Sequence, residues 1–253
     1  MTKIILSGCN GTMGKVIAKG VADRTDCEIV TGVDLTQNPQ YTFSVVDDFS
    51  KISSHADVII DFSHPSVLQG LLAYAQKNKV PTVICTTGYS SDQIADIKKA
   101  SQLTPIFYSG NMSLGINLLI ELAKKATAVF GNQFDIEIIE KHHNKKLDAP
   151  SGTALMIADG IADVMPQEPQ YIYDRHSTRK KREKNEIGLH AIRGGTIVGE
   201  HEVIFAGHDE VVSIKHQALS KEVFVTGAIN AAIFLETQKA GLYNMGSLLG
   251  SSS

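Results

Sequence analysis

The sequence predicts an α/β protein in which a doubly wound, mostly parallel sheet is followed by an α+β domain with a mixed or antiparallel sheet. Three observations lead to this prediction. A short apolar strand runs into a glycine-rich turn close to the N-terminus. Strand-like and helix-like segments then alternate as far as residue 108, which is typical of βαβ units. Later in the chain, the strand-like segments 188–193, 196–206 and 210–218 have no helix between them, so an antiparallel meander is expected.

The glycine-rich turn has the features of a nucleotide-binding loop. A strand at residues 3–7 leads into Gly-Cys-Asn-Gly-Thr-Met-Gly at residues 8–14, and a helical pattern follows. Glycines at this spacing let the backbone approach a pyrophosphate, which then rests on the helix N-terminus. A strand at residues 28–33 ends at Asp34, where such Rossmann-type folds place the acid that binds the ribose hydroxyls. The cofactor-binding candidates here are Gly8, Cys9, Asn10, Gly11, Thr12, Met13 and Asp34.

The alternation of strands and helices continues beyond this turn. Strands are predicted at residues 58–60, 81–85 and 104–108, with helices at 65–77 and 91–102 between them. Ligands of doubly wound sheets bind at the carboxyl ends of the strands, and those ends are here small or polar. Each of these segments alone is equally well a simple turn. The further cofactor-binding candidates are Cys85, Thr86, Thr87, Ser109, Gly110, Asn111 and Met112.

The composition indicates an ordinary soluble protein. The chain of 253 residues is 43% hydrophobic with a net charge of −3, which provides a core for one large or two modest domains and no field that attracts nucleic acid or a membrane. Three cysteines without CxxC spacing favour a reduced, cytoplasmic setting without disulfides or zinc. No apolar run is long enough for a signal or membrane segment. The basic run at residues 175–184 is interpreted as a mobile loop, with nucleic-acid binding as the less favoured alternative.

Groups that transfer protons or bind anions are concentrated between Glu140 and Ala154. A strand-like run at residues 134–139 precedes them, and Ser151 is the expected N-cap of the helix that follows. The free N–H groups and hydroxyls at this helix start form an anion site. Its candidate members are Ser151, Gly152 and Thr153, and the residues that stand just before it are Lys141, His142, His143, Lys145 and Lys146.

Simpler interpretations of this stretch remain open. Each lysine alone is most often a solvated surface residue, and the helix start alone is only a well-capped helix. A metal site is also conceivable for the histidine pair. Neighbouring residues of an extended segment point to opposite faces, however, so His142 and His143 do not readily share one ion, and no metal is expected.

The pattern E-x-H-H-x-x-K-x-D-A-P-S-G-T-A at residues 140–154 resembles the signature of the dihydrodipicolinate reductases of lysine biosynthesis. The resemblance covers nearly the whole chain, from the glycine turn through the segments 61–63, 86–88, 111–113 and 193–201 to Gly-Leu-Tyr at residues 241–243. Only the loop near residues 166–186 lacks a counterpart. The resemblance implies reduction of 4-hydroxy-tetrahydrodipicolinate to tetrahydrodipicolinate with NADH or NADPH, by hydride transfer to the ring with proton donation and loss of water.

The resemblance also implies roles for particular residues and domains. His142 and Lys146 would be the catalytic acid groups, and the substrate carboxylates would be held by His143, Ser151, Gly152 and Thr153. Residues 1–113 would bind the dinucleotide, and residues 231–253 would return to that domain. Residues 114–230 would bind the substrate and assemble a homotetramer through their sheet. These roles agree with the residue chemistry, because a cyclic dicarboxylate needs two anion sites.

Two departures from the family pattern favour NADH over NADPH. Relatives often have a basic residue just after the ribose acid, whereas Asp34 is followed here by Leu-Thr-Gln-Asn. Where many relatives have an arginine in the last long helix, this chain has Asn230.

Two rival functions share some of these features. Another nicotinamide-dependent dehydrogenase, acting on an amino acid or its semialdehyde, would keep the glycine turn but has no need of the His-His-x-x-Lys sequence. A non-catalytic nucleotide sensor would need no proton donor.

Overall fold

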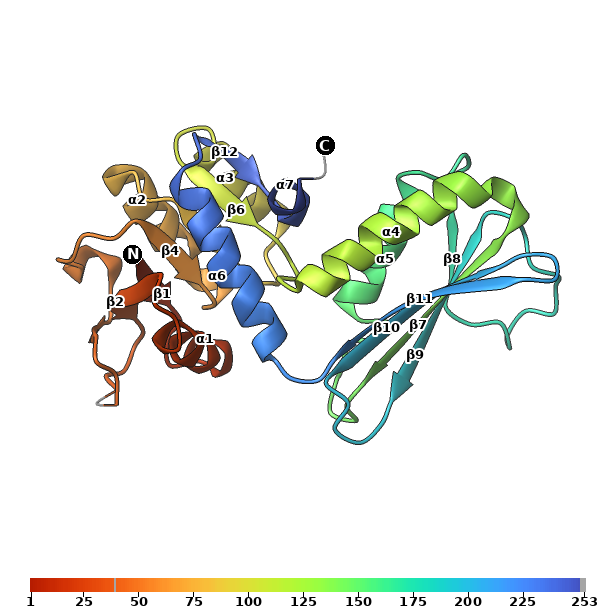
Figure 1. Cartoon of the computed structure of the whole chain (residues 1–253), viewed down its shortest axis with the longest axis horizontal. Coiled ribbons are helices and arrows are strands. Elements are labelled where there is room, and N and C mark those ends of the chain that lie inside the picture. Colours follow the sequence, from red (N-terminus) through yellow and green to blue (C-terminus); the bar gives the residue numbers. More distant parts are fainter. Residues whose placement is uncertain (39, 251–253) are drawn as a thin grey trace. The chain divides into compact units, whose positions relative to one another are not determined.

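The chain forms two compact units in the computed structural model, which describes residues 1–38 and 40–250 (Figure 1). Of the described residues, the first unit comprises 1–38, 40–114 and 221–250, and the second comprises 115–220. The return to the first unit therefore starts before residue 231, the boundary expected from the sequence. The reason is that α6 (Glu222–Glu236) buries Val225, Ala228 and Leu235 in the core of the first unit.

The first unit contains a sheet of seven parallel strands in the order β12-β6-β5-β4-β1-β2-β3, which confirms the doubly wound α/β fold. Its strands are β1 (Thr2–Ser7), β2 (Cys27–Val33), β3 (Ser44–Val46), β4 (Val58–Asp61), β5 (Thr82–Ile84), β6 (Pro105–Tyr108) and β12 (Gly241–Tyr243). Its other helices are α1 (Thr12–Ala22), α2 (Leu68–Asn78), α3 (Ser91–Ala100) and α7 (Met245–Leu249).

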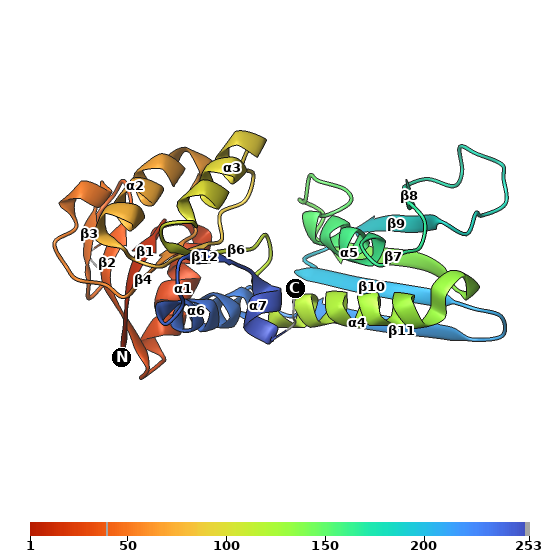
Figure 2. The same ribbon diagram turned by 90° about the horizontal axis from the view of Figure 1, so that it is seen from above.

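Alternate residues of the strands supply two cores, one on each face of this sheet. Ile4 of β1 packs with residues of α1 and α6, whereas its neighbour Ile5 packs with residues of α2 and α3. Figure 2 shows these two helix pairs on opposite sides of the sheet. Two short 3-10 turns, η1 (Phe49–Lys51) and η2 (Pro65–Val67), follow β3 and β4, so the helix predicted from Pro65 becomes α-helical only at Leu68.

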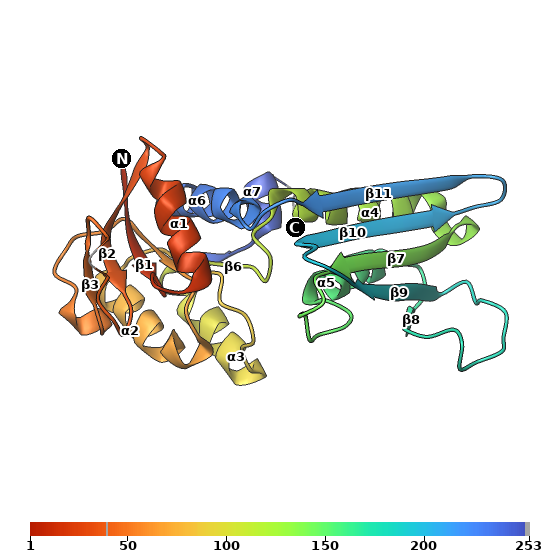
Figure 3. The same cartoon turned by 90° about the horizontal axis from the view of Figure 1, so that it is seen from below.

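The second unit contains a mixed sheet of five strands in the order β11-β10-β7-β9-β8 (Figure 3). Its strands are β7 (Asp135–His142), β8 (Gln170–Ile172), β9 (Glu186–Arg193), β10 (Gly199–Ala206) and β11 (Val211–Ala218). Its helices are α4 (Leu114–Phe130), the 3-10 turn η3 (Gly131–Gln133) and α5 (Gly152–Ala162). Among the described helices, none is long and apolar enough to cross a membrane.

The expected antiparallel meander is wrong in its strand order. Strands β10 and β11 form an antiparallel hairpin, but β9 does not pair with β10, because β7 lies between them, parallel to β9 and antiparallel to β10. The short connection between β9 and β10 crosses the carboxyl end of β7. Residues from three strands consequently meet at that end of the sheet.

The two faces of the second sheet differ. On one face, Leu119 of α4 and Ile157 of α5 pack against Ile138, Val203 and Phe205 of the strands. The opposite face presents the aliphatic residues Ile139, Ile192, Ile204 and Val211, of which Ile192 and Val211 are 46% and 64% exposed.

The basic run at residues 175–184 is tied to this sheet rather than free. Arg175 donates hydrogen bonds to Glu186 and Glu137, and Arg182 donates to Glu137 and Asp135. Glu186 is fully buried, and its hydrogen bond from Arg175, assisted by Lys180, lowers its pKa to about 2. Buried carboxylates need such cations, so the basic residues have a structural use within this unit.

Candidate active site

Five polar residues of the second unit meet where the carboxyl end of β7 meets the start of β10. We refer to Glu140, His142, Ser151, Arg193 and His201 as the Glu140 cluster. The strand register brings four of them together, because Glu140 lies opposite His201 and His142 lies opposite Arg193. Ser151 joins them as the N-cap of α5, which packs on the same face of the sheet.

Glu140 lies at the centre of this cluster. Its side chain is fully buried and accepts hydrogen bonds from Nδ1 of His142 at 2.6 Å, the backbone N–H of Ser151 at 3.0 Å, and two guanidinium nitrogens of Arg193 at 2.8 and 2.6 Å. Burial by itself raises the pKa of a carboxyl group, but the donors from Arg193, His142 and Ser151 outweigh it and hold the pKa of Glu140 below its usual range. The carboxylate is therefore ionised at neutral pH.

The two ring nitrogens of His142 have different roles. Since an ionised carboxylate only accepts hydrogen bonds, Nδ1 must be the donor to Glu140, and Nε2 remains for other chemistry. Gly199 stands beside that nitrogen, and a Cβ at this position would lie 3.1 Å from Nε2. The glycine therefore keeps space open at the reactive side of the ring.

Lys146 and His143 lie in the loop between β7 and α5. Nζ of Lys146 lies 2.8 Å from Oδ1 of Asp148, and this hydrogen bond lowers the pKa of Asp148. His143 is half-buried, while Gly152 is exposed and Thr153 is half-buried at the start of α5. The structure thus groups the predicted acid residues and the predicted anion site around one loop and one helix start.

His201 is a buried histidine that supports this helix start. Its Nε2 lies 3.1 Å from Oγ of Ser151, which also accepts the N–H of Ala154 as the cap of α5. The ring packs edge-on against that of His142 at a centroid distance of 5.2 Å. Burial, with a further contribution from His142, lowers the pKa of His201 to about 4, so the ring is neutral at pH 7. Ser151 is itself buried, with its hydroxyl committed to these two partners.

Sequence reasoning did not single out Glu140, Arg193 and His201 as functional. Glu140 opens the signature, and the other two lie in the Arg-Gly-Gly to Glu-His segment at residues 193–201, so both motifs contained the signal. The missing information was the strand order, because only the insertion of β7 between β9 and β10 brings both motifs together.

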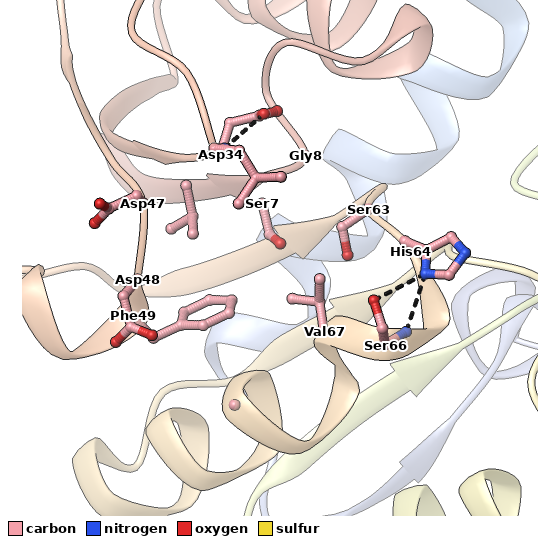
Figure 4. Close-up of a pocket in the computed structure, with 13 residues that line it drawn as sticks. Ser7, Gly8, Asp34, Asp47, Asp48, Phe49, Ser63, His64, Ser66 and Val67 are labelled. Atoms are coloured by element: carbon pink, nitrogen blue, oxygen red, sulfur yellow. Dashed lines mark hydrogen bonds between the residues drawn. The ribbon is translucent and has the colours of Figure 1, made fainter.

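A pocket of about 410 Å³ lies at the carboxyl ends of β1 and β2 in the first unit (Figure 4). Asp47 and Asp48 lie on one side of it and His64 on the other, with Asp34 along the edge between them. Gly8 also lines it, with a φ of +77°, and a Cβ there would lie 2.4 Å from the carbonyl oxygen of Phe62. Only glycine fits this close approach.

The glycine turn and Asp34 fit a dinucleotide. Helix α1 starts after Gly11, which provides no side-chain cap, so its first N–H groups are open to an anion such as a pyrophosphate. The carboxylate of Asp34 accepts the backbone N–H groups of Asn10 at 2.9 Å and Leu35 at 2.8 Å, which holds it beside the turn. The residues present are thus suited to a pyrophosphate and a ribose.

The other cofactor-binding candidates divide into buried and exposed side chains. Cys9 and Cys85 lie in the core, and burial raises the pKa of Cys9 to about 11. The hydroxyl of Thr86 donates to the buried carboxylate of Asp61 at 2.6 Å, and that of Ser109 donates to the carbonyl of Asn111 at 2.9 Å. Met112 is also buried, Met13 is half-buried, and the exposed candidates are Thr12, Thr87 and Gly110. The hydroxyls of Thr86 and Ser109 therefore hold their own loops in place.

A doubly wound parallel sheet with a glycine turn, together with histidine and lysine side chains near a capped helix start, is typical of nucleotide-dependent oxidoreductases. Among the described residues, no group of three or more His, Cys, Asp or Glu side chains is arranged to hold a metal ion. Comparison with family models then identifies the kind of reductase. The model "Dihydrodipicolinate reductase, N-terminus" matches residues 2–112, and "Dihydrodipicolinate reductase, C-terminus" matches residues 115–249. The chain belongs to the dihydrodipicolinate reductase family.

Individual relatives agree with this assignment. The chain is 52% identical over 249 residues to the 4-hydroxy-tetrahydrodipicolinate reductase of Caldanaerobacter subterraneus, covering 98% of each chain. It is 49% identical to the enzyme of the same name from Clostridium tetani, covering 99% of this chain and 98% of the other. The solved structure of a dipicolinate-bound dihydrodipicolinate reductase from Paenisporosarcina has the same fold, with a TM-score of 0.81 at 24% identity over 96% of this chain and 97% of that one.

The stability of the protein should fall between about pH 6.5 and about pH 4, and His201 should account for part of the loss. The unfolded chain protonates His201 near 6.5, whereas the folded chain resists until about 4, so within this window the unfolded state binds more protons and is favoured. The protonation of His201 lowers the free energy of unfolding by at most on the order of 3 kcal/mol across this window. Denaturant unfolding of the wild type and His201→Gln across this window should give the shallower pH dependence for the variant. An equal pH dependence of the free energy of unfolding for the two proteins would contradict the lowered pKa of His201.

Proposed function

We propose that the protein reduces 4-hydroxy-tetrahydrodipicolinate to tetrahydrodipicolinate with a nicotinamide dinucleotide, in the diaminopimelate route to lysine. The observation that carries the proposal is the buried Glu140–His142 pair beside the start of α5, which sets a proton donor next to an anion site. The relatives at 52% and 49% identity bear the name of this reaction. We expect the enzyme to act in the cytoplasm.

The reaction takes up one hydride and one proton and releases the 4-hydroxyl group as water. A bound nicotinamide cofactor supplies the hydride. Nε2 of His142 donates the proton, which requires the imidazolium form of the ring. The ionised Glu140 carboxylate, 2.6 Å from Nδ1, compensates that positive charge. Lys146 provides a second cation in the same loop and steadies the negative charge of the substrate or supplies a proton in turn.

The substrate carries two carboxylates, and the second unit offers two kinds of anion site. The start of α5 at Ser151, Gly152 and Thr153 presents backbone N–H groups and the positive end of the helix dipole. His143, in the preceding loop, provides a side-chain donor for the other carboxylate. Such capture needs no metal ion.

The cofactor is assigned to the first unit. The turn from Gly8 to Met13 holds the pyrophosphate, Asp34 binds the ribose hydroxyls, and the loops at residues 85–87 and 109–112 lie at the ends of β5 and β6. NADH is the preferred form. Among the residues that the structure describes, three aspartates and no lysine or arginine line the pocket, and Lys51 nearby is paired with Asp47 at 2.7 Å.

A homotetramer is proposed that forms through the face of the second sheet opposite α4 and α5. Ile139, Ile192, Ile204 and Val211 present aliphatic surface there, beside the ion pair of Lys141 and Glu200. A sheet face of this kind is a common association surface.

The activity itself is tested with the freshly made condensation product of pyruvate and aspartate semialdehyde. We expect NADH oxidation that depends on this product, followed by the fall in absorbance of NADH. A dehydrogenase of another class would instead respond to an amino acid or its semialdehyde. A nucleotide sensor would bind NADH without oxidising it, and either result would contradict the proposal.

NADH should give a higher kcat/KM than NADPH. The extra phosphate of NADPH would lie near Asp34, and such a like-charge contact costs on the order of 1 kcal/mol or more, which is about fivefold or more in kcat/KM. Leu35→Arg should narrow the difference in kcat/KM between the two cofactors, because its positive charge would offset that of the extra phosphate. Leu35 lines the same pocket and is 88% exposed. Steady-state kinetics with both cofactors tests this prediction. Equal kcat/KM values with NADH and NADPH for the wild type would overturn the proposed NADH preference.

Replacement of the acid groups should affect kcat, and replacement of the carboxylate ligands should affect KM. His142→Ala and Lys146→Ala should each lower kcat by about 10² to 10⁴-fold, the usual contribution of a positioned general acid. His143→Ala and Thr153→Ala should chiefly raise KM for the dicarboxylate, because carboxylate charge hardly changes during the reaction. If His142→Ala and Lys146→Ala change only KM, these two residues bind the anionic substrate and do not act as catalytic acids.

The protein should sediment as a species of about four times 27.4 kDa at micromolar concentration. Ile204→Lys should shift it toward smaller species, because the charge would have to be buried in the proposed interface. Leu103→Lys is the matched control, since Leu103 is 71% exposed in the first unit. A stable wild-type monomer would contradict the proposed interface.

A further inference from the structure

Glu140 differs from the other buried glutamates of the second unit in what it binds. Glu186 and Glu200 are paired with the long, flexible cations Arg175, Lys180, Lys141 and Lys215. Glu140 instead bonds an imidazole, a backbone N–H group and a bidentate guanidinium. These partners come from β7, from the start of α5 and from β9, so the carboxylate joins three elements.

The bonds to Glu140 leave its carboxylate a single orientation. Oε1 accepts from Ser151 N–H and one nitrogen of Arg193, and Oε2 accepts from Nδ1 of His142 and the other nitrogen of Arg193. Rotation of the carboxylate, which has no exposed surface, would break several charge-assisted hydrogen bonds at once. Oε2 therefore stays directed at Nδ1.

We propose that Glu140 is a positioning residue that fixes the tautomer and orientation of His142. With hydrogen held on Nδ1, Nε2 is the nitrogen that gives up and recovers a proton. This rests on the proposed function of His142 as the acid. A buried carboxylate that orients a catalytic histidine in this way contributes to rate without touching the substrate.

The charges around His142 support this arrangement. Arg193 on β9 neutralises Glu140, so the pair adds no net negative charge to a site that must accept a dianion. His201 on β10 faces the ring of His142 and is kept neutral by burial, so it does not compete as a cation. Lys146 in the following loop is paired with Asp148.

The test replaces Glu140 with glutamine and observes the ring of His142 directly. Nitrogen NMR of the histidine side chains, at a pH where the ring is neutral, distinguishes the two tautomers, and the signals of His142 are those lost in His142→Gln. The wild type should show hydrogen on Nδ1. Glu140→Gln should show a mixture, because the amide cannot accept from His142, Ser151 and Arg193 together.

Kinetics provide the second readout. In Glu140→Gln, kcat should fall on the order of 10² to 10⁴-fold, as when the orienting carboxylate of a catalytic histidine is lost, while KM for the dicarboxylate should change by less than about threefold. The matched control is Glu200→Gln on β10, which breaks a buried ion pair with Lys141 and leaves the contacts of His142 intact. It should change neither the tautomer nor kcat.

A second variant keeps the test decisive if Glu140→Gln fails to fold. Glu140→Gln combined with Arg193→Met removes the cation that would otherwise lose its partner. It should show the same mixture of tautomers. If hydrogen remains on Nδ1 in the folded variant with kcat unchanged, Glu140 has only a structural role and the proposal is overturned. Because NMR needs no turnover, the positioning role is decided even if the wild type proves inactive on the proposed substrate.

Discussion

The second unit depends on the burial of one ionised carboxylate. Glu140 has no exposed surface, so each of its oxygens must be satisfied from within the protein. Its donors belong to β7, β9 and the start of α5, and they can reach it only if these elements meet at the carboxyl end of β7. Removal of any one donor would leave a charged group under-bonded, so the same interaction that stabilises the fold also fixes the geometry of the site.

Strand order determines which residues share this site. The chain leaves β9, crosses the end of β7 and returns as β10, so Arg193 and His201 arrive on either side of His142. With β9 and β10 adjacent, as in a meander, the two motifs at residues 140–154 and 193–201 would not enclose the same carboxylate. The central position of β7 follows from its buried side chains, because Ile136 and Ile138 pack with Ile187 of β9 and Phe205 of β10.

The sequence was most informative where structure follows from local pattern. The glycine turn, Asp34 and the alternation of strands and helices predicted the first sheet, since each depends on neighbouring residues. The short edge strands β3 and β12 carry too few residues for a pattern. In the second unit the motif predicted His142, Lys146 and the start of α5. Their partners Arg193 and His201, and the anchoring of the basic run by Glu137 and Glu186, depend on strand order, which local periodicity does not encode.

The two units apply opposite charge arrangements to anionic ligands. In the first, Asp34, Asp47 and Asp48 line a pocket beside a helix N-terminus, and under the proposed function the backbone would attract a pyrophosphate while the carboxylates would oppose a further phosphate nearby. In the second, the buried carboxylate of Glu140 is already matched by Arg193, so it does not oppose a dianion at the start of α5. Neutralisation within the protein therefore allows Glu140 to orient His142 without repelling a dicarboxylate substrate.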